Sequence, residues 1–323
     1  MSTASDRVIR FVDTDVLRVA YEQHGRDGAF PVVLVHGFPY DPRAFDDVAA
    51  ILTDAQPRAQ FRAHFRTHFR VIVPYVRGFG STRLISESTM RSGQQGAVGH
   101  DLVSLLDALK INQAVLAGFD WGARAACVVA ALWPERVRGL VTASGYQIQN
   151  IAKATQPAKP EDEHRYWYQY YFNTERGRNG LRQNRHAFCK LLWSLWSPTW
   201  KFDDPTYDAT AASFDNPDFV DVSIHSYRHR HGNAEGDPRY AEIEERLAHR
   251  PPIMVPSIAI HGDADDVNPL HVSEGHERLF PKRYERRLFT GVGHNLPQEA
   301  PGDRKSTRLN SSHLRLSRMP SSA

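Results

Sequence analysis

The sequence predicts an α/β fold: a mostly parallel sheet flanked by helices, with a helical cap inserted into the chain. Three observations support this prediction. Apolar runs of strand length alternate with segments of helical period. Polar, glycine-containing turns directly follow several of those runs. A stretch rich in Trp and Tyr, residues 147–250, interrupts the alternation and has little strand pattern.

The alternating part of the chain supplies the expected sheet and its flanking helices. The run PVVLVHG at residues 31–37 is nearly all apolar, as a strand buried on both faces should be. Helices are expected near residues 45–52, over 99–110, after Gly122 and over 271–280. Strands are expected at residues 7–12, 16–22, 31–37, 70–76, 113–119, 137–144, 256–262 and 283–289.

The aromatic interruption divides the chain into parts. We expect a first core part at residues 1–146, a helical cap at 147–250, and a second core part at 251–301. Aromatic helices such as RHAFCKLLWSLW (185–196) would form a lid with an apolar underside over the carboxyl ends of the strands. This arrangement predicts an apolar substrate pocket.

Two segments depart from the pattern. Residues 61–70, FRAHFRTHFR, repeat Phe and Arg every four residues and are expected to form an amphipathic helix before a strand. Residues 302–323 are rich in Ser and Arg, have no periodicity, and are expected to be a disordered tail foreign to the fold.

Composition narrows the classes of partner and compartment. The formal net charge is +3, but the tail alone contributes about +4, so the basic balance does not indicate a nucleic-acid partner. Two cysteines, Cys127 and Cys189, exclude a disulfide framework and fit a reducing compartment. No secretory signal is apparent and no run approaches the ~20 apolar residues of a membrane span. We therefore expect a cytoplasmic protein, of undetermined oligomeric state.

The segment GFDWG, residues 118–122, joins an expected strand to an expected helix. A glycine-framed turn between a strand and a helix is the setting of a nucleophile elbow, G-x-S-x-G. In this chain the serine position is occupied by Asp120.

Two further polar sites follow expected strands, HGDADD at 261–266 and GVGHN with His294. A nucleophile, an acid and a histidine in this chain order are typical of a hydrolytic triad on an α/β sheet, whose strand ends gather at one site. Asp265 is the expected acid, Asp266 is the alternative, and Asp263 is expected to be a turn residue.

The motif HGFP, residues 36–39, follows the buried third strand. Its Phe38 N–H is expected to face the N–H of Trp121, and two converging N–H groups form an oxyanion hole. A turn this tight favours a cis Phe38–Pro39 peptide. His36 is expected to be a buried structural histidine bonded to backbone.

An aspartate at the elbow indicates a different chemistry from a serine. A carboxylate with a pKa near 3.9 needs no base for activation, and its natural target is a strained or activated sp³ carbon. Attack there forms an alkyl ester on Asp120, which water activated by His294 would hydrolyse, with Asp265 orienting the histidine. The pattern therefore indicates cleavage of an epoxide or of a carbon–halogen bond.

These motifs, together with RGFGSTR (77–83) and the inserted cap, resemble the epoxide hydrolase branch of the α/β-hydrolase fold, to which haloalkane and fluoroacetate dehalogenases are related. The resemblance runs from about Arg7 to Pro301. It implies conversion of an apolar epoxide and water to a vicinal diol without metal or organic cofactor. It also implies a last helix after Pro301, where the Ser/Arg-rich tail begins instead, so reduced stability is expected.

The resemblance further implies two cap tyrosines that donate hydrogen bonds to the epoxide oxygen. Tyr168 in YWYQYYF and Tyr227 in HSYRHR occupy matching contexts. Tyr166, Tyr170 and Tyr171 are the alternatives for the first of these tyrosines.

Two dehalogenase alternatives fit the sequence less well. A haloalkane dehalogenase holds the departing halide with N–H donors; Trp121 could supply one, whereas Phe38 has no side-chain donor. In a fluoroacetate dehalogenase the nucleophile belongs to the motif DRxxR, which has two arginines. In this chain only the second of them, Arg124, is present. For the haloalkane dehalogenase alternative, a second halide donor could come from one of the cap tryptophans, Trp167, Trp193, Trp196 and Trp200.

A third alternative is a noncatalytic receptor that binds an apolar ligand on this fold.

Overall fold

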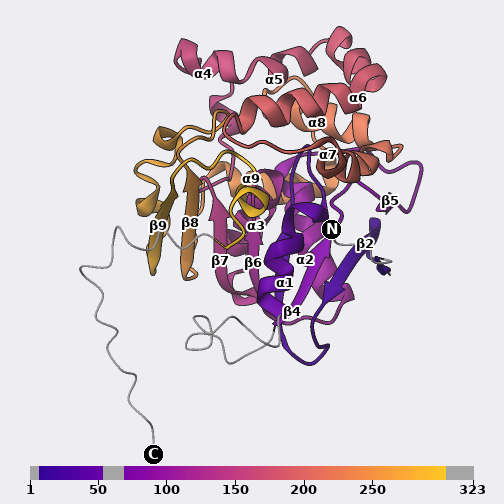
Figure 1. The fold of residues 1–323 in the computed structure, drawn as a ribbon, viewed down its shortest axis with the longest axis vertical. Helices are drawn as coiled ribbons and strands as arrows, with labels where there is room; N and C mark the ends of the chain where they lie inside the picture. The colour runs from indigo at the N-terminus through magenta and orange to yellow at the C-terminus, as the bar shows by residue number, and fades with distance from the viewer. Residues whose placement is uncertain (1–6, 54–68, 303–323) are drawn as a thin grey trace, which may run out of the picture.

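The computed structural model describes residues 7–53 and 69–302, and these are built around one twisted sheet (Figure 1). All the expected strands are present, and β5 is an additional short strand. The strand order is β1-β2-β4-β3-β6-β7-β8-β9, with β5 paired to β2. The strands are β1 (Ile9–Asp13), β2 (Leu17–His24), β3 (Phe30–Val35), β4 (Phe69–Pro74), β5 (Arg83–Leu84), β6 (Ala114–Gly118), β7 (Val137–Ala143), β8 (Ser257–Gly262) and β9 (Tyr284–Phe289).

The sheet is mostly parallel, as predicted. Strand β2 pairs antiparallel with β1, β4 and β5, and every pairing from β4 to β9 is parallel. Strands β3 and β6 are neighbours, with Val35 opposite Gly118 at their carboxyl ends. The topology therefore brings the HGFP segment beside the elbow, although about 80 residues separate them in the sequence.

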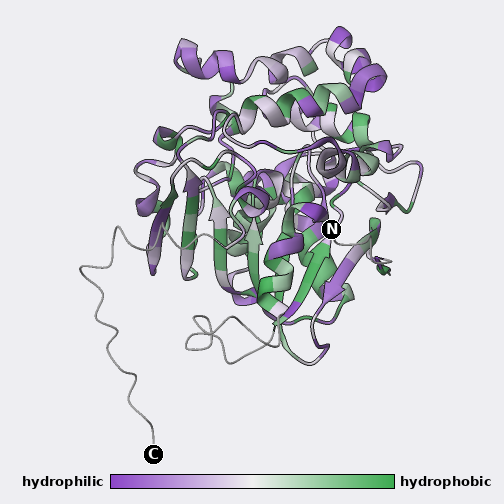
Figure 2. Cartoon of the chain, viewed as in Figure 1, coloured by the Kyte–Doolittle hydropathy of each residue, from purple (hydrophilic) through white to green (hydrophobic). Residues whose placement is uncertain are grey.

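Helices cover both faces of the sheet because its central strands are apolar on both sides. In β3, Val32 and Leu34 pack into the core beside α1 and the cap, whereas Val33 and Val35 pack into the core beside α2 and α3. Figure 2 colours the central strands mainly green, that is, hydrophobic. The helices that flank the sheet are α1 (Asp46–Thr53), α2 (Gln95–Ala108), α3 (Trp121–Leu132) and α10 (Leu296–Glu299).

Residues 144–256, all of which the structure describes, contain helices and no strand. Most of these helices lie across one end of the sheet (Figure 1), and α4 at the outer edge is strongly hydrophilic (Figure 2). The limits 147–250 for the cap stay a prediction. The helices are α4 (Pro160–Arg165), α5 (Trp167–Phe172), α6 (Glu175–Trp196), α7 (Asp204–Ala211), α8 (Phe219–Arg230) and α9 (Ala241–Ala248). Short 3₁₀ helices across the chain are η1 (Pro42–Phe45), η2 (Pro134–Arg136), η3 (Ile151–Lys153), η4 (Ala212–Asp215), η5 (Pro238–Tyr240), η6 (Leu270–Ser273) and η7 (His276–Leu279).

Buried polar contacts join these helices to the loop after β3. The indole N–H of Trp193 donates to the carbonyl oxygen of Pro39 at 2.8 Å. The buried carboxylate of Asp41 accepts from the hydroxyls of Thr210 at 3.1 Å and Ser213 at 2.7 Å. Because buried polar groups are costly to leave unpaired, these bonds fix the position of the helices over the sheet.

Some expectations from the sequence were wrong in detail. The helix expected at 271–280 is instead two 3₁₀ turns, η6 and η7, because Gly275 between them has φ 72° and ends the helical path. Of the helix expected at 61–70, Phe69 and Arg70 belong to β4, where they pair with β3. Residues 61–68 lie outside the described residues, as does the tail from residue 303 onward.

Two other expectations concern the cysteines and membrane-spanning helices. Cys127 and Cys189 are both buried and unpaired, as expected for Cys127 in an apolar helix. Within the two described ranges, no helix combines the length and the apolar character that crossing a membrane requires.

Candidate active site

Asp120 occupies a sharp turn between β6 and α3. Its φ of 52° and ψ of −125° are values that non-glycine residues rarely adopt. The framing glycines are required by close packing, because a Cβ at Gly122 would collide with the carbonyl oxygen of Val35 and a Cβ at Gly118 would collide with the backbone of Gly122. The GFDWG motif therefore folds as the expected elbow and presents Asp120 at the carboxyl edge of the sheet.

One carboxylate oxygen of Asp120 is held by two backbone N–H groups. Its Oδ1 accepts from Phe38 at 2.8 Å and from Trp121 at 2.7 Å. These are the two donors that the sequence predicted to converge. A Cβ at Gly37 would collide with the same oxygen, so only glycine permits this approach. The expected cis peptide between Phe38 and Pro39 is confirmed.

His294 follows β9, and both of its ring nitrogens face carboxylates. Nδ1 lies 2.9 Å from Oδ2 of Asp265, and Nε2 lies 3.6 Å from Oδ2 of Asp120. The second oxygen of Asp265 accepts from the N–H groups of Val267 at 3.1 Å and Asn268 at 2.9 Å. The structure thus brings together three side chains from separate strand ends, in the order Asp265, His294, Asp120.

The other two acids of the loop after β8 point elsewhere. Asp266 pairs with Arg165 at 3.2 Å and is partly exposed. Asp263 accepts from the N–H of Gly291 at 2.6 Å, as a turn residue would. The geometry therefore favours Asp265 over Asp266 as the partner of His294.

The backbone around His294 is held by Glu299 and Ser197. Glu299 accepts from the N–H groups of Gly293 at 2.7 Å and Asn295 at 3.0 Å, and from the Ser197 hydroxyl at 2.6 Å. The Ser197 oxygen in turn accepts from the N–H of His294 at 3.0 Å. Since Ser197 follows α6, this network joins the histidine loop to the helical segment above it.

The carboxylates and the imidazole shift one another's pKa values. Burial lowers the pKa of His294, but the negative charges of Asp265 and Asp120, together with the hydrogen bond to Asp265, outweigh it and raise that pKa to about 10. Burial raises the pKa of Asp120, yet His294, Arg124 and the Trp121 N–H more than compensate, so this pKa is lowered. At neutral pH Asp120 is therefore ionised and His294 is protonated.

Tyr168 on α5 and Tyr227 on α8 are buried and contact each other, and Tyr227 also packs beside Phe38 and Trp121, whose N–H groups hold Asp120. Their ring centroids are 5.3 Å apart in an edge-to-face arrangement. Burial raises the pKa of both hydroxyls above the usual value, so both stay protonated donors at neutral pH. Tyr170 is exposed and bonds to Glu163, whereas Tyr171 stacks on Phe188.

The side chains around this site are mainly aromatic. Phe38 contacts the rings of Trp121, Trp196 and Tyr227, and Trp196 also lies 5.2 Å from the His294 ring, centroid to centroid. The Trp193 N–H is already bonded to Pro39, so it is not free for a ligand. Of the four cap tryptophans considered as halide donors, Trp196 is the one whose ring packs against His294.

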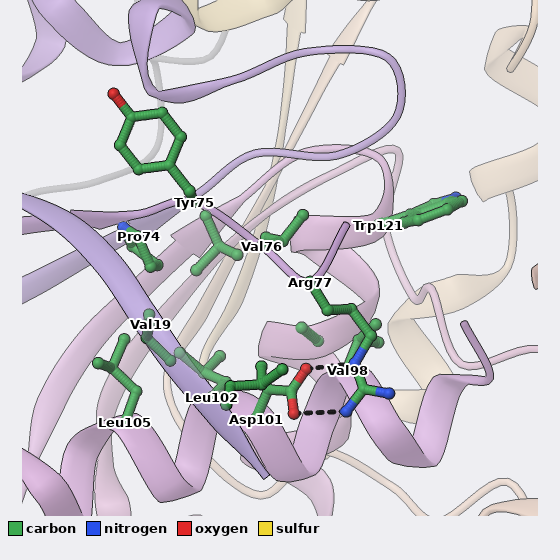
Figure 3. A pocket seen from close by; sticks show the side chains of 13 residues that line it. Val19, Pro74, Tyr75, Val76, Arg77, Val98, Asp101, Leu102, Leu105 and Trp121 are labelled. Atoms are coloured by element: carbon green, nitrogen blue, oxygen red, sulfur yellow. Dashed lines mark hydrogen bonds and ion pairs between the residues drawn. The ribbon is translucent and has the colours of Figure 1, made fainter. Parts of the chain in front are cut away.

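His36 and Arg77 are structural, on the evidence of their bonds. His36 is fully buried, and its ring nitrogens contact the carbonyl oxygen of Gly37 and the N–H of Val76. Arg77 forms a two-bond ion pair with Asp101, at 2.5 and 2.6 Å. Figure 3 shows this pair at the end of a cavity of about 30 Å³. That volume holds about one water molecule, too little for a substrate.

Comparison with known proteins identifies the family. Residues 31–301 match the family described as "alpha/beta hydrolase fold". The chain belongs to that family. The match covers both the elbow and the His294 loop of this α/β hydrolase, so it includes the whole Asp120–His294–Asp265 constellation. Among the described residues, no group of three or more His, Cys, Asp or Glu side chains is placed to hold a metal ion.

Individual relatives carry more specific names. The α/β hydrolase is 45% identical to a crystal structure from Klebsiella pneumoniae of a proposed epoxide hydrolase, with a TM-score of 0.84, covering 91% of this chain and 93% of that one. It is 25% identical to Epoxide hydrolase A of Mycobacterium tuberculosis over 91% of this chain and 94% of the relative. A haloalkane dehalogenase of Mycolicibacterium paratuberculosis is 30% identical over 45% of this chain and 44% of its own length.

Sequence reasoning missed several polar residues that the structure places around this site. Glu299 and Ser197 have no motif of their own, and only the fold brings them to the His294 loop. Tyr40 directly follows HGFP, and its buried hydroxyl has no hydrogen-bond partner among the described residues. Arg230 lies three residues after Tyr227, a helical spacing that could have signalled a shared face.

Proposed function

We propose that this α/β hydrolase is an epoxide hydrolase that converts an epoxide and water to a vicinal diol through an alkyl ester on Asp120. The observation that carries the proposal is the division of labour between the two oxygens of Asp120. Oδ1 is held by two N–H groups, and Oδ2 faces His294. The names of the relatives from Klebsiella pneumoniae and Mycobacterium tuberculosis support the same activity.

In the first step, Oδ2 of Asp120 attacks one epoxide carbon and the carbon–oxygen bond of the ring breaks. Oδ1 remains on the Phe38 and Trp121 N–H groups and becomes the carbonyl oxygen of the ester. The opening ring develops negative charge on its oxygen, and Tyr168 and Tyr227 would donate hydrogen bonds and a proton to it. Both hydroxyls are protonated at neutral pH, since burial raises their pKa values further above the ordinary value near 10.

In the second step, Nε2 of His294 removes a proton from water, and the resulting hydroxide attacks the carboxyl carbon of the ester. The negative charge of the tetrahedral intermediate develops on Oδ1, where the two N–H groups already point. Collapse of the intermediate breaks the bond between the carboxyl carbon and Oδ2, and His294 returns its proton to Oδ2, which leaves as a hydroxyl of the diol. The acid proton of the re-formed carboxyl group returns to the tyrosine that protonated the ring oxygen, which restores the carboxylate of Asp120. Asp265 holds the imidazole and stabilises its positive charge.

Formation of the ester itself prepares the histidine for the second step. Two carboxylates raise the pKa of His294 in the free site. Once Asp120 is esterified it carries no charge, so only Asp265 continues to raise the pKa. The imidazole then loses its proton more readily, at the stage where a base is required.

A dehalogenase that uses the same nucleophile is the second candidate, supported by the haloalkane dehalogenase relative and by Trp196 beside His294. A departing halide needs two N–H donors pointing into the site. Trp193, one candidate donor, is bonded to Pro39. The two buried tyrosines instead suit an oxygen that must gain a proton, which favours the epoxide.

The test is a product assay on the purified protein with matched panels of epoxides and haloalkanes. Diol formation that disappears in Asp120→Asn supports the proposal. Halide release without diol would move the assignment to a dehalogenase, and ligand binding without any product would indicate a receptor.

The ester intermediate has a separate isotopic test. In a single turnover in ¹⁸O-water, with enzyme in excess, the label should enter the peptide that contains Asp120 while the diol stays unlabelled. Label found in the diol during the first turnover would show direct attack of water on the epoxide and would contradict the ester route.

A further inference from the structure

Two arginines of the site, Arg124 and Arg230, face each other without a carboxylate partner. Arg124 is 4% exposed, and its Nε has no hydrogen-bond partner among the described residues. In the described part of the chain, neither guanidinium forms an ion pair. Buried charges are normally paired, so the buried Arg124, with the half-buried Arg230 beside it and no carboxylate partner, requires an explanation.

Helical geometry places these arginines beside the reacting groups. Arg124 follows Asp120 by four residues at the start of α3, and Arg230 follows Tyr227 by three residues on α8. Residues with these spacings lie on one face of a helix, about one turn apart. Each helix thus presents one reacting group and, a turn further along, one arginine. The charges of Arg230 and Asp120 both act on Arg124, the first lowering its pKa and the second raising it.

The position of Arg124 is unfavourable for the folded protein alone. Burial and the nearby charge of Arg230 lower the pKa of Arg124 to about 10. A cation in the first turns of a helix also opposes the positive end of the helix dipole. Arg77 shows how this chain pairs an arginine for structure: it is 1% exposed and has Asp101, the Ser92 carbonyl and the Tyr240 hydroxyl as acceptors.

The two arginines share one neutral acceptor. With its amide oriented to satisfy both donors, the side-chain oxygen of Gln149 lies 3.2 Å from Nη2 of Arg124 and 2.8 Å from Nε of Arg230. Gln149 and Arg230, though not Arg124, also line a cavity of about 360 Å³ beside α5 and α8. Glu163 lines the same cavity, but its oxygens are occupied by the Ala158 N–H and the Tyr170 hydroxyl. Space for a ligand therefore adjoins Arg230 and the glutamine that joins it to Arg124.

We propose that Arg124 and Arg230 bind a carboxylate of the substrate, so that the preferred substrates are short epoxy acids rather than neutral epoxides. This inference rests on the proposed epoxide hydrolysis and specifies its substrate class. Guanidinium groups recognise carboxylates through paired, charge-assisted hydrogen bonds. Along their helices, Arg124 follows Asp120 and Arg230 follows Tyr227 by about one turn, a rise of roughly 5 Å. This spacing favours short acids, in which only a few bonds separate the carboxylate from the epoxide.

The kinetic test compares 5,6-epoxyhexanoate with its uncharged isostere 5,6-epoxyhexanamide. For the wild-type protein, kcat/KM for the acid should exceed that for the amide by about tenfold or more, the factor that a charge-assisted hydrogen bond supplies. In Arg124→Met and Arg230→Met the ratio should fall toward one, mainly through a higher KM for the acid. Arg230→Lys, which keeps the charge, should retain part of the preference.

A matched control is Arg182→Met, which removes an exposed arginine of α6 that is only 3.8 Å from its partner Asp221. This variant should keep the wild-type ratio. Equal kcat/KM for the acid and the amide in the wild type would overturn the proposal, as would a ratio that survives both arginine substitutions. If the melting temperature shows that Arg124→Met does not fold, the substrate ratio of Arg230→Met tests the proposal instead. Arg230 is partly exposed at a helix end, so its substitution should leave the fold intact.

A binding measurement separates failure of this proposal from failure of the proposed function. Hexanoate should raise the melting temperature of the wild-type protein more than hexanamide, and Arg230→Met should abolish the difference. If neither epoxide gives diol while hexanoate still binds in this way, epoxide hydrolysis is wrong and the anion site stands. If hexanoate and hexanamide act alike, the anion site is wrong, whatever the activity.

Discussion

The two sides of the site are held by different kinds of hydrogen bond. On the sheet side, Asp120 and Asp265 each accept from two backbone N–H groups. On the cap side, Tyr168 accepts from the side chain of Gln169, and Arg230 donates to the side chain of Gln149. Backbone donors persist whatever the side chains are, whereas side-chain donors change with each substitution. The sheet side can therefore retain one chemistry while the cap side adapts to different substrates.

The largest expected effect comes from the sheet side. His294→Ala should lower steady-state turnover by at least about 10³-fold while leaving ester formation possible. Intact-protein mass spectrometry should then show a stable increase equal to the mass of one epoxide, located on the Asp120 peptide. Normal turnover without any adduct would show that His294 does not act on an ester.

Loss of one cap hydroxyl should have a smaller effect. Tyr227→Phe or Tyr168→Phe should slow ester formation by about 10²-fold, since one donor to the opening ring is removed. Rapid-quench kinetics would measure ester formation and ester breakdown separately. If either substitution slowed breakdown more than formation, the tyrosine would not act on the ring oxygen.

The pH dependence of ester breakdown probes the coupling between the two sides of His294. Esterification removes the negative charge of Asp120, so the pKa of His294 in the ester lies below its value of about 10 in the free site. Breakdown requires neutral imidazole and should therefore speed up as pH rises through this lowered pKa. Below it, the rate should fall about tenfold per pH unit and the ester should accumulate. A breakdown rate that stays constant from pH 10 down to the lowest pH at which the protein remains folded would contradict His294 as the base.

The smallest expected kinetic effect is at Glu299, which touches no reacting atom in the proposed mechanism. Glu299→Gln keeps an acceptor oxygen and should reduce kcat only a few-fold. Glu299→Ala leaves the buried N–H groups of Gly293 and Asn295 unpaired and should lower the free energy of unfolding by about 1–3 kcal/mol. Urea denaturation would measure the loss. Equal stability of the two variants would show that these hydrogen bonds do not hold the His294 loop.

Much of the fold and of the candidate site was visible in the sequence, because local signals carried it. Apolar runs marked the strands, and the glycines of GFDWG marked the elbow, since side chains there would collide with neighbouring backbone. Chain order alone suggested Asp120, Asp265 and His294 as partners. The helix expected at 271–280 failed because apolar spacing does not register a left-handed glycine such as Gly275.

The sequence by itself determined which chemical groups end the strands, because strand and turn formation depend on neighbouring residues. Only the tertiary structure decided which of those groups meet. It paired His294 with Asp265 and not with Asp266, separated Tyr168 from Tyr170 and Tyr171, and set Arg230 of α8 against Arg124 of α3. These contacts join residues far apart in the chain, and strand order and the packing of helices over the sheet fix them. No local sequence pattern indicates the strand order or the packing of helices over the sheet.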